Sequence, residues 1–415
     1  MTQLTLGHRP ILRGASLLSP ILLAGCTGIA LPPWQSTVRE LEADQAAAVQ
    51  RQPVAAPLAT RGPLSTIEPA STAPVTTPRT MPAAPYAAAV AARFPEPDRP
   101  YITPGLGAGR SSWTSQSELA AWLREQARQA QRTAPGQAAV VTIGTSQAGL
   151  PIEALVFSSG VGADAAALKA TERPTVLLLA QQHGNAPASA EALLVVAREL
   201  AQGPLRPLLS RINVLIVPRA NPDGAAKARR LTDNGFDMAH DHLVLETPEA
   251  QAIAKLARDY QPTVVLEAQE YPAVGALVNT LGGLPKADAW VAYATTANLP
   301  EFLTKAAEEW FRQPLVSALT AAGLSSEWPY STSSTSSIME GKTVAWGDLQ
   351  PDNSANVHGL KNRISLTVAS RGVGLERAHS QRRLYAQVTA ITSVLNSTAE
   401  RASELAQLKP YLDLE

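Results

Sequence analysis

Residues 175–194 read TVLLLAQQHGNAPASAEALL, and they give the clearest indication of architecture in this chain of 415 residues. The first six residues are apolar with a β-branched start, a composition typical of a buried strand. Pro187 predicts the start of a helix that reaches about Gln202, because the N–H that proline lacks is unpaired in a first helical turn anyway. His183 therefore lies at the carboxyl end of a buried strand, where open α/β sheets bind ligands.

Three other segments also join an apolar run to a polar end. They are residues 212–224 (INVLIVPRANPDG), residues 263–272 (TVVLEAQEYP) and residues 363–374 (RISLTVASRGVG). Predicted helices over residues 187–202 and 248–260 alternate with these strands, which indicates a mostly parallel sheet. We therefore predict an α/β fold, a single domain whose mostly parallel mixed central sheet is flanked by helices on both faces. The polar strand ends are expected to converge on one pocket.

Further elements complete the predicted domain. They are a helix over residues 115–133, a hairpin over residues 140–158, a helical stretch over residues 300–323 and a C-terminal helix over residues 376–408. The helical stretch over residues 300–323 is interpreted as a subdomain or a lid, and residues 350–359 as a polar loop. His379, Arg382 and Arg383 are expected on a solvated face of the last helix.

The order of five motifs resembles the zinc carboxypeptidase family, especially its bacterial branch and the related zinc deacylases of succinylglutamate and acetylaspartate. Those proteins carry His-Gly-Asn/Asp-Glu-Pro, Asn-Pro-Asp-Gly, Asp-Leu-Asn-Arg-Asp, Asp-(Ala/Leu)-His-Glu and Glu-(Thr/Ser)-Arg-Gly. This chain reads HGNAP, NPDG, DMAHD, EAQE and ASRG in the same order. The resemblance covers roughly residues 101–405 and implies a zinc-carboxypeptidase-like fold.

By this resemblance, the functional positions of the family fall on His183, Ala186, Arg229 or Arg230, Ala239, His240, Gln269 and Ala369. The three zinc-ligand positions are His183, Ala186 and Gln269, and the general-base position is Ala369. The pair that would hold the terminal carboxylate of a substrate is replaced by Ala239 and His240. The arginine that polarises the scissile carbonyl corresponds to Arg229 or Arg230.

A hydrolytic zinc site needs three protein ligands and an open position for water. Alanine offers no lone pair and a glutamine amide oxygen is a weak ligand, so His183 stays a weak metal candidate and no cofactor is expected. Structural zinc sites gain about 10–16 kcal/mol from binding, so losing two of three ligands lowers metal affinity by several powers of ten. A missing general base costs about 100- to 10,000-fold in rate. The pattern argues against the hydrolytic mechanism of the family, whether drift or deliberate inactivation produced it.

The alternative is an active enzyme whose metal site is built from other side chains, and its cofactor would be zinc. Glu191, Glu270, His240 and His242 are the side chains that a displaced ligand set could use. The simpler interpretation places Glu191 in solvent or at a helix cap. It makes His183 a hydrogen-bonded pocket histidine.

The ends of the chain indicate export. Residues 15–24 are a short apolar stretch behind His8, Arg9 and Arg13, too short for a stable membrane span and typical of a signal peptide. The sequence Leu-Ala-Gly-Cys around Cys26 resembles a bacterial lipobox, which implies lipidation of Cys26 and an outer-membrane lipoprotein facing the periplasm. An ordinary signal peptide with an incidental cysteine is the alternative.

We predict a signal peptide over residues 1–25, a Pro/Ala/Thr-rich tether over residues 26–103, the folded domain over residues 104–408 and a tail over residues 409–415. The 35 basic and 35 acidic residues balance, so no nucleic-acid partner is expected. Three functions stay open. They are an inactive carboxypeptidase-like protein that binds a peptide or peptidoglycan fragment, an active zinc carboxypeptidase or deacylase with displaced ligands, and a structural envelope protein.

Overall fold

The computed structural model describes residues 84–412, except for residues 99, 134–137, 159–161 and 335–341. The predicted signal peptide, Cys26 and the tether up to residue 83 lie outside the described residues, as do residues 413–415. Within the described part of the chain, no helix combines the length and the apolar character needed to cross a membrane.

The centre of the fold is an eight-stranded sheet in the order β1-β2-β4-β3-β5-β10-β6-β7. The strands are β1 (Ala138–Thr145), β2 (Pro151–Phe157), β3 (Thr175–Ala180), β4 (Asn213–Val217), β5 (Val264–Pro272), β6 (Ala289–Tyr293), β7 (Ser326–Glu327) and β10 (Ile364–Val373). Strands β4, β3, β5 and β10 are mutually parallel, while β1 and β2 pair antiparallel with their neighbours. Strand β6 pairs antiparallel with β10 and parallel with β7. This is the predicted mixed, mostly parallel α/β sheet. A separate hairpin joins β8 (Tyr330–Ser334) to β9 (Lys342–Trp346).

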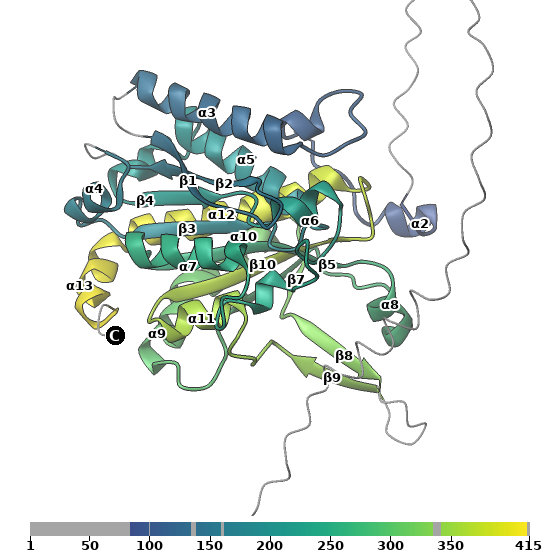
Figure 1. Ribbon diagram of the computed structural model, residues 1–415. Helices are drawn as coiled ribbons and strands as arrows, with labels where there is room; N and C mark the ends of the chain where they lie inside the picture. The colour runs from purple at the N-terminus through teal and green to yellow at the C-terminus, as the bar shows by residue number, and fades with distance from the viewer. Residues whose placement is uncertain (1–83, 99, 134–137, 159–161, 335–341, 413–415) are drawn as a thin grey trace, which may run out of the picture. The chain divides into compact units, whose positions relative to one another are not determined.

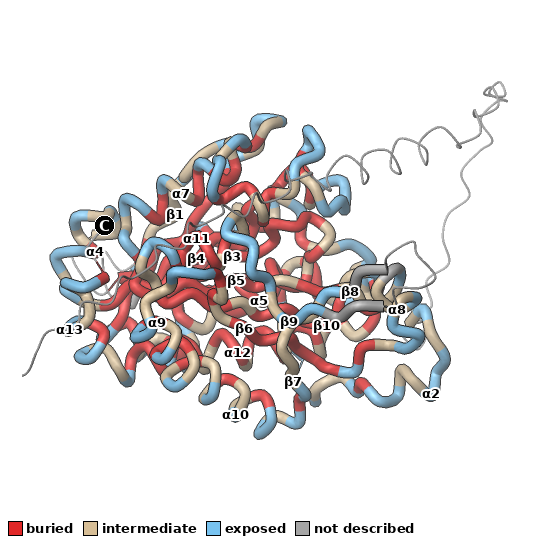
Figure 2. Tube along the Cα trace, turned by 90° about the horizontal axis from the view of Figure 1, so that it is seen from below, coloured by how far each residue is buried: buried red, intermediate tan, exposed pale blue. Residues whose placement is uncertain are grey.

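Helices cover both faces of the sheet (Figure 1). The longer ones are α3 (Gln116–Thr133), α5 (Pro187–Gln202), α7 (Pro248–Tyr260), α10 (Gln313–Ala321), α12 (Ser380–Glu400) and α13 (Ala402–Leu412). The short helices are α2 (Ala88–Ala91), η1 (Pro104–Leu106), α4 (Ala165–Ala170), η2 (Arg206–Ser210), α6 (Pro222–Ala226), η3 (Met238–His240), α8 (Ala276–Leu281), α9 (Glu301–Ala306), η4 (Ala307–Arg312) and α11 (Ser354–Leu360). Together they leave the sheet in the interior. The exposed residues lie mainly at the periphery of the domain (Figure 2).

Strand β3 explains why apolar and polar residues do not alternate in residues 175–180. Val176 and Leu178 belong to the apolar core under α3, α5 and α12, whereas Leu177 and Leu179 belong to the core under α4 and α7. A strand that is buried on both faces needs apolar residues at every position. Helices α5 and α7 begin at Pro187 and Pro248, and Thr247 caps α7 by accepting the N–H of Ala250. These bounds agree with the sequence predictions.

Three of the predicted elements differ from the structure. The supposed polar loop of residues 350–359 contains α11, which Asn353 caps through the N–H of Asn356. The C-terminal helix is two helices separated at Arg401. Residues 300–323 form α9, the π-helical turn η4 and α10, and their apolar side chains, such as Phe311, lie in the main core. The lid interpretation is therefore wrong, because this stretch is a structural layer of the domain.

The tether boundary at residue 103 also lies too late in the chain. Residues after Ala84 already pack on the domain: the ring of Tyr86 stacks on His379 with centroids 6.0 Å apart, and Arg371 lies 3.5 Å from the ring centroid of Phe94. Few apolar residues in a proline-rich stretch suffice for docking when a complementary surface exists.

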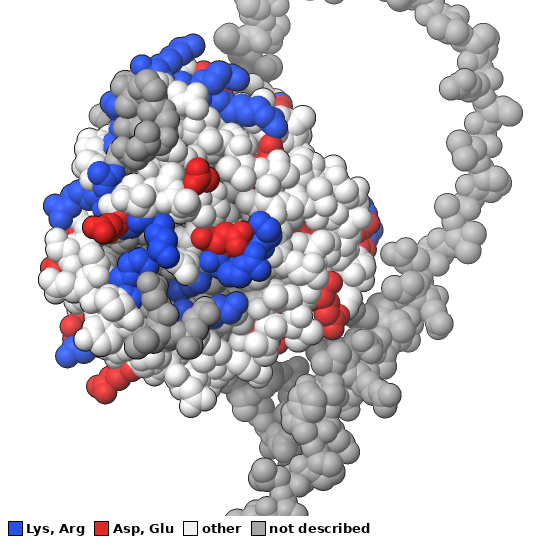
Figure 3. All heavy atoms as spheres, turned by 60° about the vertical axis from the view of Figure 1, so that its left-hand side comes forward, with Lys and Arg blue, Asp and Glu red and all other residues white. Residues whose placement is uncertain are grey.

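The residues expected on a solvated helix face also make buried contacts. Arg382 binds Asp288 at 2.6 Å and Arg383 binds the buried Glu270. Elsewhere, basic and acidic side chains are interspersed on the face that Figure 3 shows.

Candidate functional site

A cavity of about 230 Å³ opens at the carboxyl ends of β3, β5 and β10. Of the eight positions assigned by the resemblance, six line it: His183, Arg230, Ala239, His240, Gln269 and Ala369. The other two do not. Ala186 is buried at the start of α5, and Arg229 is exposed and does not line the cavity. The strand ends therefore converge as predicted, because the carboxyl ends of the parallel strands β3, β5 and β10 lie at the same edge of the sheet.

Strand register aligns three cavity residues. Ala369 on β10 is paired with Gln269 on β5 and, on its other side, with Trp290 on β6. Ala369 belongs to an apolar cluster with Tyr271 and Trp290, whose rings stack with centroids 3.9 Å apart. Ala369, the residue to which the resemblance assigns the general-base position, is thus part of an apolar, aromatic wall.

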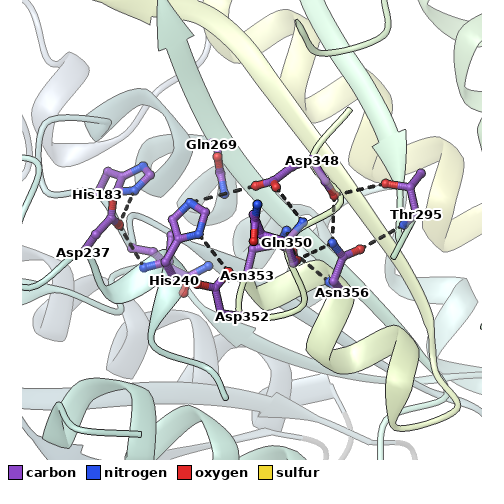
Figure 4. A network of polar contacts seen from close by, with 12 residues as sticks. His183, Asp237, His240, Gln269, Thr295, Asp348, Gln350, Asp352, Asn353 and Asn356 are labelled. Carbon is purple, nitrogen blue, oxygen red and sulfur yellow. Dashed lines mark hydrogen bonds and ion pairs between the residues drawn. The ribbon is translucent and has the colours of Figure 1, made fainter. Parts of the chain in front are cut away.

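His183 is held by a carboxylate (Figure 4). Its Nε2 lies 2.8 Å from Oδ1 of Asp237, and Oδ2 of Asp237 accepts two bonds from Arg230, from Nη2 at 2.8 Å and from Nε at 3.1 Å. Burial lowers the pKa of His183, so its neutral ring donates through Nε2 and keeps its lone pair on Nδ1. Burial alone would raise the pKa of Asp237, but the bond from His183 and the charge of Arg230 hold it well below its ordinary range. His183 is therefore the hydrogen-bonded pocket histidine that the sequence favoured.

A second polar cluster forms the deep wall. The side-chain amides of Gln182 and Gln269 both donate to Oε1 of Glu267, and Gln182 in turn accepts a bond from His242. Burial raises the pKa of Glu267 to about 7, against the effect of these hydrogen bonds. Burial likewise lowers the pKa of His242 to about 4, so this ring is neutral. The cluster is satisfied internally and close to neutral.

The outer wall comes from the segment before and within α11 (Figure 4). His240 lies between two carboxylates, with Nδ1 3.2 Å from Asp352 and Nε2 4.0 Å from Asp348. Asn356 fixes this segment to the sheet: its Oδ1 accepts the N–H of Thr295 at 2.9 Å, and its Nδ2 donates to the carbonyl of Asp348 at 2.8 Å. These hydrogen bonds hold in place the segment that carries Asp348 and Asp352.

The donor set does not fit zinc. Among the described residues, no group of three or more His, Cys, Asp or Glu side chains is close enough to hold a metal ion. Asp237 orients His183 as carboxylates orient metal-binding histidines. The two other positions that the resemblance assigns to zinc ligands carry a methyl group at Ala186 and an amide at Gln269. A single imidazole cannot replace the three ligands that a hydrolytic zinc site requires.

Two of the side chains considered for a displaced ligand set have structural roles. Glu191 is buried, which corrects the interpretation as a solvated or capping residue, and it accepts bonds from the backbone N–H and the hydroxyl of Thr114. Glu270 points away from Gln269 to Arg383 and to the N–H of Ala188. Neighbouring side chains of β5 point to opposite faces of the sheet, and this alternation produces the separation.

Sequence reasoning missed the groups that complete the site. Asp237, Asp348 and Asp352 were not singled out, and neither was the wall residue Trp290. Asp237 stood within the quoted DMAHD motif, so the motif carried a usable signal. The other three belong to segments without a recognisable pattern, and only the fold brings them to the cavity.

Comparisons with known proteins show which proteins this chain is similar to. The family model described as zinc carboxypeptidase matches residues 123–280. "Carboxypeptidase 2" of Trichophyton rubrum is 28% identical over 229 residues, which cover 54% of this chain and 41% of that protein. "Carboxypeptidase D" of Rattus norvegicus is 36% identical over 110 residues, covering 23% of this chain and 8% of that protein. This chain thus spans less than half the length of these curated relatives.

A solved structure has a similar fold. Carboxypeptidase A of Helicoverpa armigera superimposes with a TM-score of 0.50 at 14% identity, over 71% of this chain and 75% of that chain. At this level of identity the likeness concerns the path of the backbone.

Proposed function

We propose that this chain is a non-hydrolytic relative of the zinc carboxypeptidases, whose family model matches residues 123–280, and that its pocket binds a peptide or a peptidoglycan-derived ligand. The observation that carries the proposal is the donor set. His183 keeps the orientation of a metal ligand, yet Ala186 and Gln269 stand where its partners would be and Ala369 stands where a general base would be. Binding and catalysis depend on different residues, so one can persist without the other.

The cavity itself supports retained binding. Aromatic and apolar groups such as Tyr271 and Trp290 line part of it, and polar side chains such as Gln269 line the rest, so a ligand would find both apolar contacts and hydrogen bonds there. Hydrogen bonds hold some of its polar residues in fixed orientations, as that between His183 and Asp237 does. A purely structural role in the envelope is the competing interpretation, and it predicts that no ligand binds.

The proposed location rests on the sequence. A lipid on Cys26 would anchor the protein to the membrane, and the proline-rich segment behind it would hold the domain in the periplasm, on the outer membrane. A ligand from the cell wall suits that position. No nucleic-acid partner is included in the proposal.

Metal analysis tests the loss of hydrolysis. The chain without residues 1–25 is equilibrated with zinc, separated from free metal and measured by elemental mass spectrometry. We expect far less than one ion per chain and no release of C-terminal residues from peptides. One tightly bound ion per chain, together with chelator-sensitive hydrolysis, would establish the alternative of a displaced ligand set.

Reversion of the missing groups is the complementary test. The variant Ala186→Glu, Gln269→His and Ala369→Glu should bind zinc, because Asp237 already orients His183. A matched control, Ala186→Gln with Ala369→Gln, adds similar volume without the ligands and should not bind it. If a folded triple variant fails to bind zinc, the assignment of these positions is refuted.

A further inference from the structure

The edge of the sheet opposite the candidate site carries two depressions that are lined by basic side chains. Strands β3, β5 and β10 begin side by side there, since the N–H of Thr263 donates to the carbonyl of Thr175 and the N–H of Ile364 to that of Thr263. A cavity of about 110 Å³ lies just before β5 and β10, and a wider depression of about 460 Å³ lies just before β3 and β4. We call their basic lining residues the basic edge: Arg173, Arg206, Lys361, Arg363 and Lys409.

The linings of both depressions supply positive charge only. No carboxylate lines either of them among the residues that the structure describes. In the smaller cavity, the hydroxyl of Thr263 and the amide of Asn362 stand beside the cations as further hydrogen-bonding groups. Asp259, at the nearby end of α7, already contacts Lys255 at 2.9 Å and Arg258 at 2.8 Å, so two cations face one carboxylate at this helix end.

The cations of the basic edge are oriented, and their charge acts on the interior. Nη1 of Arg363 donates to the carbonyl of Ala257 at 2.9 Å, which fixes the guanidinium beside the cavity. Burial lowers the pKa of His358 well below its usual range, and the charges of Arg363 and Lys361 lower it further. At the wider depression, Nε of Arg206 is buried without a hydrogen-bond partner among the described residues. Such groups suit an anion with several acceptor oxygens, for which a phosphate group is the model.

Two depressions favour a surface that carries many phosphates over a single small ligand. Strand β5 separates β3 from β10, so the backbones at Arg173 and Arg363 lie roughly 10 Å apart, twice the spacing of neighbouring strands. One free phosphate would fill only one depression, whereas lipid headgroups present phosphates side by side. The chain has 35 basic and 35 acidic residues, so attraction to an anionic membrane has to come from a local surplus of positive charge.

We propose that the basic edge docks on the phosphate headgroups of an anionic membrane, which turns the candidate cavity at the opposite edge of the sheet away from the lipid. This inference concerns a different face of the domain from the proposed binding function and stands without it. The proposed lipid on Cys26 would bring the domain close to such a surface, but the docking itself rests on the charges of the basic edge.

Sedimentation with lipid vesicles tests the proposal. The chain without residues 1–25 is used without attached lipid, so that only the protein can bind, and it keeps every residue that the structure describes. Vesicles of phosphatidylglycerol and phosphatidylcholine in equal parts should bind it, whereas vesicles of phosphatidylcholine alone should not. Binding should weaken as salt is raised, because salt screens exposed charges.

The variant Lys361→Gln with Lys409→Gln should bind the anionic vesicles about 25-fold more weakly, since each basic side chain near such a surface contributes about fivefold. Circular dichroism and the melting temperature check that the variant is folded. The control is Lys227→Gln with Lys286→Gln, which changes the net charge equally at exposed lysines after α6 and before β6, on the side of the candidate site. The control should bind as the parent does.

Three results would overturn the proposal. Equal binding to both kinds of vesicle would show that charge does not drive the contact. An equal loss in the variant and the control would show that net charge, rather than the basic edge, decides it. Failure to bind anionic vesicles, combined with a melting temperature that inorganic phosphate raises in the parent and not in the variant, would make the basic edge a site for a small anion instead of a membrane surface.

Discussion

Replacing Glu270 by Gln should destabilise the domain by about 3–5 kcal/mol, because it leaves a buried guanidinium without its anion. Oε1 of Glu270 accepts bonds from Nε of Arg383 at 2.7 Å and from its Nη2 at 2.6 Å, and the two side chains are 0% and 3% exposed. Burial raises the pKa of the Glu270 carboxyl, and the charge of Arg383 opposes that effect. Since domains are stable by about 5–15 kcal/mol, the loss should be large but measurable.

Urea unfolding followed by circular dichroism gives the change in the free energy of unfolding. The variant Glu270→Leu with Arg383→Met removes both charges and should recover much of the loss, because apolar groups of similar volume often replace a buried ion pair at little cost. A loss below about 1 kcal/mol for Glu270→Gln would refute the reasoning, since it would mean that water reaches Arg383. A double variant as unstable as the single one would show that packing, rather than charge, decides the effect.

Three further predictions concern a helix cap, a buried carboxyl and metal. Thr247→Ala should cost about 1–2 kcal/mol in urea unfolding, because it removes the N-cap of α7 and a bond to Asp241; an unchanged midpoint would contradict the cap. The pKa of Glu267 is raised from 4.5 to about 7, so its contribution to stability is full below pH 4.5 and is lost as the pH rises through 7. Relative to Glu267→Gln, the parent should therefore lose up to roughly 3 kcal/mol between pH 4.5 and 8, and a flat difference would rule out the shift. Chelator should leave the melting temperature within about 1 °C, whereas a clear drop would reveal a stabilising metal.

The family and the elements of the sheet could be predicted from local patterns. The apolar run of β3, Pro187 at the start of α5 and Thr247 at the start of α7 are signals carried by residues close together in the chain. The order of the motifs predicts that His183, Gln269 and Ala369 lie at one pocket, and all three line the cavity. Hydrophobic periodicity, prolines and caps act over a few residues, so a chain reveals them without its fold.

Partners far apart in the chain could not be predicted in this way. Glu191 is buried because Thr114, 77 residues away, donates to it, and Arg383 is buried because Glu270 lies 113 residues away. The charge balance of the cavity depends on Asp348 and Asp352, which no motif marks and which only the loop before α11 brings to His240. The motif residues led to the proposal that two zinc ligands and the general base are absent. The charges that surround the cavity were decided by tertiary contacts, because a side chain's electrostatic environment depends on distances in space rather than along the chain.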